Sequence, residues 1–281
     1  MVRNRAAVAV VGLGAMGDPI ARHLLAAGVP VQVHDLDPAA VDRAVALGAR
    51  AVAALRDVGR GADLVVVVVP TDEDVRSVCL GVDGLLAGCA AGAVVLLCSS
   101  VRPQTCEAVA DAAPPGVGVL DAALTGGVRG AEAGEVNLLV GGDGGVLAGV
   151  RPLLEPWTKA VHHLGPLGAG QVGKTANNLV HWAQISAITE ALELARRGGV
   201  PVPAMRAALQ DGPTDSRTLR ELEQMRLTWH AKDLANTADL AERVGLDIPM
   251  ASTAREVMAR TTVDDVARLL ADGPLRPGGT G

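Results

Sequence analysis

Short apolar runs alternate with amphipathic segments through residues 1–165, and this alternation is typical of an α/β fold with parallel strands. Parallel strands are apolar along their whole length because helices cover both faces of their sheet. Strands are expected at 6–11, 31–34, 63–69, 93–98, 117–120, 136–140 and 161–164, with the very apolar run 63–69 at the centre. Helices are expected between them, at 19–27, 72–79, 104–113 and 145–155.

The rest of the chain shows helical spacing only. From Gln171 to Arg197 no breaker interrupts the apolar positions, and a basic last turn precedes Gly198 and Gly199. At 1.5 Å per residue this helix is roughly 40 Å long, which suits an inter-domain spine. Further helices are expected at 203–210, 215–227, 231–245, 249–259 and 263–270.

A glycine motif, Gly12-Leu13-Gly14-Ala15-Met16-Gly17, joins the first strand to the first helix. Gly12 permits a tight turn, Gly14 lets a pyrophosphate approach the backbone, and Gly17 lets the helix pack closely on the strand. The helix N-terminus then offers N–H groups to the phosphates. The motif predicts a dinucleotide-binding Rossmann-type fold, with Leu13 and Met16 among the residues that contact the cofactor.

Asp35 ends the second strand and bears on the choice of cofactor. A carboxylate at this position accepts hydrogen bonds from the adenosine ribose and repels a 2′-phosphate. No Arg or Lys follows before Arg43. We therefore expect NAD(H) to be preferred, with NADP(H) possible. The alternative is that Asp35 is an ordinary turn residue before Pro38.

These elements predict two domains and a tail. Residues 1–165 form a doubly wound α/β Rossmann-type domain that binds the dinucleotide. Residues 166–272 form an all-α domain for substrate binding and dimerisation, built around the long inter-domain helix, and residues 273–281 form a flexible tail.

Composition narrows the function further. The chain is 49% apolar and 20% charged with a formal charge of −6, which disfavours disorder and nucleic-acid binding. Its four cysteines show no C-x-x-C pair and no histidine at zinc spacing, so we expect reduced thiols and no metal. Without a signal-like start or an 18-residue apolar span, we expect no membrane segment and a cytoplasmic location.

Lys174 and Asn178 are the strongest candidates for chemistry. The chain prefers arginine and has only three lysines, and a lysine, unlike an arginine, can give up its proton. Lys174 and Asn178 share a helix face, so an ammonium and a carboxamide together can bind and protonate an alkoxide. His181 lies on the same face and either lines a pocket or is structural.

Two polar segments are candidates for ligand contacts. The glycine-rich segment Asp121–Gly134 offers backbone N–H groups that, with the Thr125 hydroxyl, can hold a carboxylate; the alternative is a loop that serves packing only. Arg129 either holds a second acidic group or is solvated. The hydroxyls of Ser99 and Ser100 either contact the nicotinamide side or cap the helix expected at 104–113.

The ordered motifs resemble those of the β-hydroxyacid dehydrogenase family, which includes 3-hydroxyisobutyrate dehydrogenase and tartronate semialdehyde reductase. The resemblance covers about residues 8–250. Its motifs are Gly12–Gly17, Asp121–Gly134, Gly168-x-Gly170-x-x-x-Lys174-x-x-Asn177-Asn178 and Lys232-Asp233-Leu234.

The resemblance implies an NAD(P)-dependent enzyme that interconverts a small β-hydroxy acid and its semialdehyde or keto acid. Lys174 would be the general acid/base with Asn178 as its partner in positioning the substrate, and Thr125, Gly126 and Gly127 would hold the substrate carboxylate. Val69, Pro70 and Ser100 would border the nicotinamide, and Lys232 would reach the cofactor or the substrate. The family also implies a homodimer or a homotetramer.

Departures from the family pattern leave the substrate open. Thr125 stands where the family usually has serine, Leu97 replaces a common acid, residues 135–137 are Glu-Val-Asn, and the chain has no Phe or Tyr. One alternative is an imine reductase on the same fold, which typically lacks the lysine and carries NADP-binding residues after the second strand. The other is a catalytically silent NAD-binding scaffold, whose mark is loss of the lysine.

Overall fold

The computed structural model describes residues 7–275, which form two compact units. The first unit is Met1–Lys174 and the second is Thr175–Gly281, so the division falls inside the long helix α8 (Ala169–Arg197). Of the tail expected at 273–281, residues 276–281 lie outside the described residues. Each unit is described by itself.

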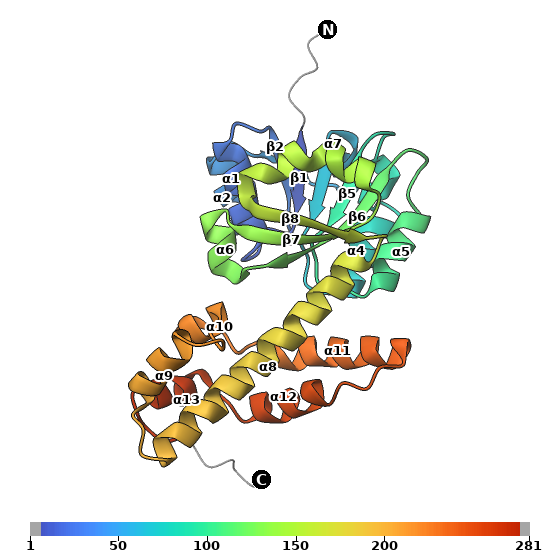
Figure 1. Ribbon diagram of the computed structural model, residues 1–281. Helices are drawn as coiled ribbons and strands as arrows, with labels where there is room; N and C mark the ends of the chain where they lie inside the picture. The colour runs from blue at the N-terminus through green and yellow to red at the C-terminus, as the bar shows by residue number, and fades with distance from the viewer. Residues whose placement is uncertain (1–6, 276–281) are drawn as a thin grey trace. The chain divides into compact units, whose positions relative to one another are not determined.

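The first unit is built on one sheet that has helices on both faces (Figure 1). Within residues 7–174 it has eight strands in the order β3-β2-β1-β4-β5-β6-β7-β8. Neighbouring strands are parallel except β6 and β7, which are antiparallel. The doubly wound α/β fold is therefore confirmed. The strands are β1 Val8–Val11, β2 Val31–His34, β3 Arg50–Ala51, β4 Leu64–Val67, β5 Val94–Leu97, β6 Gly118–Thr125, β7 Val136–Gly141 and β8 Thr158–Gly165.

Alternate side chains of each central strand enter two separate cores, because successive side chains point to opposite faces of a sheet. Val8 and Val10 of β1 belong to the core under α1, α2, α6 and α7, whereas Ala9 and Val11 belong to the core under α3, α4 and α5. The helices are α1 Gly17–Ala26, α2 Pro38–Ala46, α3 Leu55–Arg60, α4 Asp72–Leu80, α5 Pro103–Asp111, α6 Gly127–Ala133 and α7 Gly144–Leu154, with the 3-10 turns η1 Leu85–Gly88 and η2 Glu155–Trp157.

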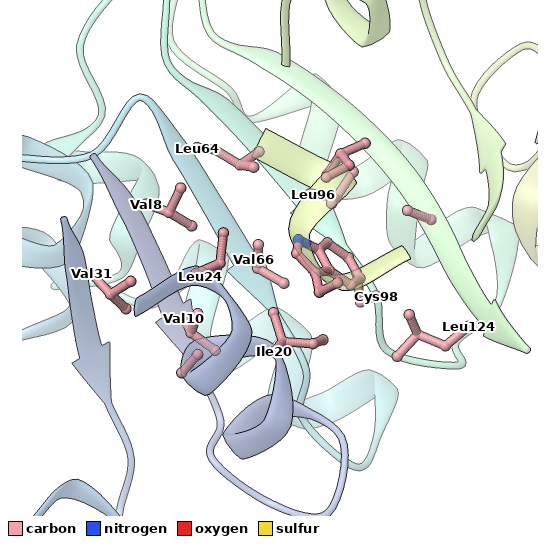
Figure 2. Close-up of a cluster of buried hydrophobic side chains, with 14 of the residues drawn as sticks. Val8, Val10, Ile20, Leu24, Val31, Leu64, Val66, Leu96, Cys98 and Leu124 are labelled. Carbon is pink, nitrogen blue, oxygen red and sulfur yellow. The ribbon is translucent and has the colours of Figure 1, made fainter. Parts of the chain in front are cut away.

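The first core consists of small aliphatic side chains. Figure 2 shows Ile20 and Leu24 of α1 among the strand residues Val8, Val10 and Val66. All of these are at most 1% exposed. Because valine and leucine fill the space under α1, the glycine turn that precedes this helix is held rigidly against the sheet.

Two parts of the first unit differ from expectation. Residues 38–60, for which no element is predicted from the sequence, form α2, β3 and α3. The glycine-rich segment Asp121–Gly134 was expected to be a loop, yet β6 continues through Thr125 and α6 begins at Gly127. The cause is antiparallel pairing with β7, which covers every residue from Asp121 to Thr125.

The second unit is helical and packs around its own core. Its helices after α8 are α9 Val202–Gln210, α10 Arg217–Arg220, η3 Leu222–Gln224, α11 His230–Val244, α12 Pro249–Ala259 and α13 Val263–Leu270. The expected single helix at 215–227 is wrong. The Arg206 guanidinium of α9 binds the carbonyl oxygens of Leu219 and Arg220, so these oxygens point to a side chain instead of a following turn.

Two further findings concern membrane-spanning helices and the cysteines. Among residues 7–275, every helix is too short or too polar to cross a lipid bilayer. The four cysteines, all within the described chain, carry free thiols. Burial raises the pKa of the Cys79 thiol to about 12, so this thiol is protonated and unreactive at neutral pH.

The core makes a stability prediction. Leu96 of β5 is 0% exposed, so Leu96→Ala removes buried methyl groups and leaves a cavity. We expect the free energy of unfolding, measured by urea titration with circular dichroism, to fall by about 2–5 kcal/mol. The matched control is Val82→Ala, since Val82 is 92% exposed and its loss should change stability by less than about 0.5 kcal/mol. Equal effects in the two variants would contradict this packing.

Candidate active site

The carboxyl ends of β1, β2, β4, β5 and β6 meet at one edge of the sheet, because these strands are parallel. Doubly wound sheets bind their ligands at this edge, near the point where the strand order reverses. Here the order reverses between β1 and β4. The edge carries the candidate residues of the first unit, namely Gly12, Leu13, Gly14, Met16, Gly17, Asp35, Val69, Pro70, Ser100, Thr125, Gly126 and Gly127.

The glycine turn after β1 is crowded on its protein side and open on the other. Gly12 has φ +92°, and a Cβ there would lie 2.2 Å from the Val68 carbonyl oxygen. A Cβ on Gly17 would lie 1.8 Å from the Gly12 carbonyl oxygen. In contrast, a Cβ on Gly14 would meet no described atom within 4 Å. This open backbone, followed by the N-terminus of α1, fits a dinucleotide pyrophosphate.

Asp35 is anchored to the glycine turn. Its Oδ2 accepts the Leu13 N–H at 2.5 Å, and its Oδ1 accepts the Asp37 N–H at 2.8 Å. A cavity of about 360 Å³ begins here, lined among others by Gly14, Asp35 and Arg43. The bond to Asp37 is the one that a turn residue makes, and the bond to Leu13 fixes the same carboxylate beside the glycine turn, so both interpretations of Asp35 stay open. Arg43 also lines this cavity, so it contributes a positive charge that the sequence pattern did not predict there.

Ser99 organises the ends of β4 and β5. The Val69 N–H donates to Ser99 Oγ at 2.8 Å, and Ser99 Oγ donates to the Val67 carbonyl oxygen at 3.4 Å. Helix α5 starts after Arg102, and no side-chain cap is found there within the described chain. The helix-cap reading of the serine pair is therefore wrong. Ser99 fixes Val69 at the ligand edge, and the half-buried Ser100 follows it.

The segment after β6 turns sharply at two glycines. Gly126 has φ +112° and Gly127 has φ +66°, a region that side chains other than glycine rarely adopt. Thr125 is half-buried, Gly127 is exposed, and Arg129 is exposed on α6. The turn therefore leaves backbone groups accessible at this edge, directly after Thr125; that they hold a carboxylate stays a prediction.

Lys174 reaches this same segment. Its Nζ donates to the Leu124 carbonyl oxygen at 2.8 Å, and its side chain is half-buried. Leu124 directly precedes Thr125 in β6. The structure thus brings the candidate acid/base next to the candidate carboxylate anchor, although the two are far apart in the sequence.

Asp121 was not predicted to be a site residue, yet it binds the backbone just before Lys174 in the chain. Its side chain is 0% exposed, and its two oxygens accept the N–H groups of Gly168 at 2.6 Å and Gln171 at 2.8 Å. Burial raises the pKa of this carboxyl above its ordinary value, while the two backbone N–H bonds oppose the rise. The signal available in the sequence was a lone carboxylate within an apolar strand.

The remaining candidates belong to the second unit. Asn178 lies one turn beyond Lys174 on α8, is 7% exposed, and its Oδ1 accepts a bond from Asn177 Nδ2 at 3.4 Å. The His181 ring nitrogen Nδ1 lies 3.4 Å from Thr218 Oγ1, which favours the structural reading of His181.

Lys232 is exposed in the first turn of α11. The next residue, Asp233, accepts the Trp182 indole N–H at 3.0 Å and so ties this helix to α8 within the second unit. In the described part of the chain, no three His, Cys, Asp or Glu side chains group closely enough to hold a metal ion.

Comparison with protein families gives two matches. Residues 7–165 match the family described as the NAD binding domain of 6-phosphogluconate dehydrogenase. Residues 168–268 match the family described as the NAD-binding domain of NADP-dependent 3-hydroxyisobutyrate dehydrogenase. The two matches run in the same order as the motifs and cover both units.

Individual relatives agree with these matches. An NAD-dependent L-serine dehydrogenase of Pseudomonas aeruginosa is 41% identical over 69% of this chain, and the match covers 65% of that relative's length. A 2-hydroxy-3-oxopropionate reductase of Escherichia coli is 32% identical over 88% of both chains. The solved structure of Mycobacterium tuberculosis 3-hydroxyisobutyrate dehydrogenase with L-serine has a TM-score of 0.86 at 27% identity, covering 98% of this chain and 100% of that one.

The anchored Asp35 makes a prediction about the cofactor. We expect Asp35→Ala to weaken NADH binding by about 10-fold and to narrow the preference for NADH over NADPH, because a ribose acceptor and a repulsive charge are lost together. Fluorescence titration with each nucleotide measures both effects. The matched control is Asp63→Ala, since Asp63 also accepts a backbone N–H, from Ala7, but lies at the other end of the strands. An unchanged NADH preference in Asp35→Ala would refute the role.

Proposed function

The chain belongs to the β-hydroxyacid dehydrogenase family, and from this premise we propose that it is an NAD(P)-dependent dehydrogenase. It interconverts a small β-hydroxy acid and its semialdehyde or keto acid, with Lys174 as the general acid/base. The observation that carries this proposal is the bond from Lys174 Nζ to the carbonyl oxygen of Leu124, which places an ammonium beside the turn at Thr125.

The residues for the cofactor follow from the fit of the glycine turn. The open backbone at Gly14 and the N-terminus of α1 receive the pyrophosphate, and Asp35 receives the adenosine ribose. The anchored carboxylate supports a preference for NAD(H), with NADP(H) possible because Arg43 lines the same cavity. When bound, the nicotinamide supplies or accepts the hydride. Val69, Pro70 and Ser100 border this ring in our proposal.

The substrate is held by its carboxylate. The Thr125 hydroxyl and the N–H groups of Gly126 and Gly127 are the donors that we assign to it. Relatives named for L-serine and 2-hydroxy-3-oxopropionate act on three-carbon acids with oxygen on the β-carbon, a size that suits so short an anchor. The methyl group of Thr125, where the family usually has serine, narrows the space beside the carboxylate.

Lys174 handles the proton. An ammonium has three N–H donors, so one can bind Leu124 while another points to the reacting oxygen of the substrate. In the reduction it gives a proton to the alkoxide as the hydride arrives at the carbonyl carbon; in the oxidation the neutral amine takes the proton from the hydroxyl. An ordinary lysine has a pKa of about 10.4, so the reduction needs no shift at neutral pH.

Asn178 and Lys232 remain predictions, because they lie in the second unit. Asn178 would steady the substrate from the same face of α8, one turn beyond Lys174. Lys232 would contact the cofactor or substrate from α11. The expected homodimer or homotetramer and the expected cytoplasmic location also stay predictions.

The two alternatives are less well supported. A silent scaffold is expected to have lost the lysine, yet Lys174 is present and directed at the anchor segment. An imine reductase is expected to replace the lysine and to carry NADP-binding residues after β2, where Asp35 stands.

The acid/base role is tested by Lys174→Ala. We expect kcat to fall by about 100- to 10,000-fold, the usual worth of a positioned proton donor, while the dissociation constant of NADH changes little. Stopped-flow NADH absorbance and fluorescence titration measure the two. Lys159→Ala is the matched control, because Lys159 is an exposed lysine on β8 of the same unit. Near-normal turnover in Lys174→Ala would sink the assignment.

The reaction itself is tested with a substrate panel. Short β-hydroxy acids and their semialdehydes are assayed with NAD and NADP side by side, together with esters of the same compounds. We expect turnover of the acids with NAD and a loss of at least 10-fold in kcat/KM for the esters, because the ester lacks the charge that the anchor holds. Turnover of cyclic imines, with none of the acids, would favour the imine reductase.

A further inference from the structure

We propose that Asp121 and Gln171 are positioning residues, which fix the first turns of α8 on the sheet and so set Lys174 beside its substrate. This inference rests on the proposed function, since the position of Lys174 matters to turnover only if Lys174 moves the proton. Neither residue is assigned a contact with substrate or cofactor; Asp121 acts through the start of α8, and Gln171 acts through α8 and through its bonds to Val101 and Ser99.

Strand β6 holds α8 at two points. Asp121 binds the N–H groups of Gly168 and Gln171, and three residues farther on Leu124 binds Lys174 Nζ. Three residues span roughly 10 Å along a strand. Two attachments so far apart fix both the height and the rotation of the helix start relative to the strand. The next residue of the same strand, Thr125, opens the carboxylate anchor.

The Asp121 bond is not an ordinary helix cap. Helix-capping side chains usually come from the residue just before the helix and serve its stability. Asp121 instead reaches Gly168 and Gln171 from positions 47 and 50 residues away. A cap from a distant strand ties the helix to the sheet. Both carboxylate oxygens accept a backbone N–H, at 2.6 and 2.8 Å, so one buried side chain holds two N–H groups at the start of α8.

The glycines around Asp121 show that the close approach is built in. A Cβ on Gly141 would lie 2.3 Å from Asp121 Oδ1, and a Cβ on Gly170 would lie 2.6 Å from Oδ2 and 2.3 Å from the Leu139 carbonyl oxygen. Neither position has room for a side chain. The glycine at 170 in the motif before Lys174 is therefore required by the close approach of α8 to both β7, at Leu139, and β6, at Asp121.

Gln171 adds a link to the nicotinamide side of the edge. Its Oε1 accepts the Val101 N–H at 3.1 Å, and its Nε2 donates to the Ser99 carbonyl oxygen at 2.9 Å. Ser99 in turn holds Val69. Gln171 is 2% exposed, so these bonds are shielded from water. The first turn of α8 is thus hydrogen-bonded both to the segment after β5 and to β6.

The first test is Asp121→Asn, which keeps the size but turns one acceptor into a donor that opposes a backbone N–H. We expect kcat to fall about 10- to 100-fold, as small misplacements of catalytic groups do. The dissociation constant of NADH should stay within about 2-fold. Asp143→Asn is the matched control: Asp143 caps α7 by accepting the Val146 N–H at 2.9 Å, so it should leave kcat unchanged.

The second test places Asp121→Asn in a Lys174→Ala background, assayed by single-turnover NADH oxidation. A residue that acts through Lys174 has no further effect once Lys174 is gone. We therefore expect the double variant to match Lys174→Ala within about 2-fold. If Asp121→Asn lowered the single-turnover rate by the same factor with and without Lys174, the positioning role would be overturned. Near-normal turnover of Lys174→Ala itself would instead overturn the proposed function.

A third variant keeps the inference testable if Asp121→Asn does not fold. Gln171→Met keeps the side-chain length and removes both hydrogen bonds of the side-chain amide, to Val101 and to Ser99. We expect at least a 5-fold loss of kcat, again absorbed in the Lys174→Ala background. Wild-type kcat in Gln171→Met, or a loss that persists without Lys174, would contradict the inference.

Discussion

The pair of hydrogen bonds that the buried Asp121 carboxylate accepts at the start of α8, from Gly168 and Gln171, is the constraint on which the candidate site depends. A charge in an apolar sheet is costly unless it is paired, and the free N–H groups of a helix N-terminus are a suitable partner. The pairing fixes where α8 begins, and Lys174 follows at a set distance along the helix. A Cβ at Gly141 or Gly170 would clash with Asp121 and with neighbouring backbone atoms, so both positions need glycine.

Strand β6 therefore connects three functions that are separate in sequence. Its middle holds the helix start, its Leu124 carbonyl receives the Lys174 ammonium, and its end at Thr125 opens into the glycine turn. The parallel strands β1, β2, β4 and β5 bring the dinucleotide residues to the same edge. In the proposed function, the acid/base, the carboxylate anchor and the residues that would hold the dinucleotide thus share one frame, which is what hydroxyacid chemistry requires.

The sequence predicted the features that depend on local pattern. Strand, glycine turn and helix from residue 8 to 26 form one contiguous signal. Helix α2 was missed although its start, Asp37 capping the Ala39 N–H before a first-turn proline, is also local. The sequence marks Asp121 only as a lone carboxylate in an apolar strand and does not mark Gln171; their partners come from distant segments, so their positions at the site could not be predicted. The strand character of 121–125 arises likewise from pairing with β7.

The central claim, that Lys174 moves the proton of a carboxylate-anchored hydroxy acid, is tested most directly by a crystal structure with NAD and a bound β-hydroxy acid. We predict that Lys174 Nζ lies within about 2.6–3.2 Å of the substrate hydroxyl oxygen and that the carboxylate accepts the N–H groups of Gly126 and Gly127. A substrate bound with its carboxylate on Lys174, or with its hydroxyl out of reach of Nζ, would contradict it.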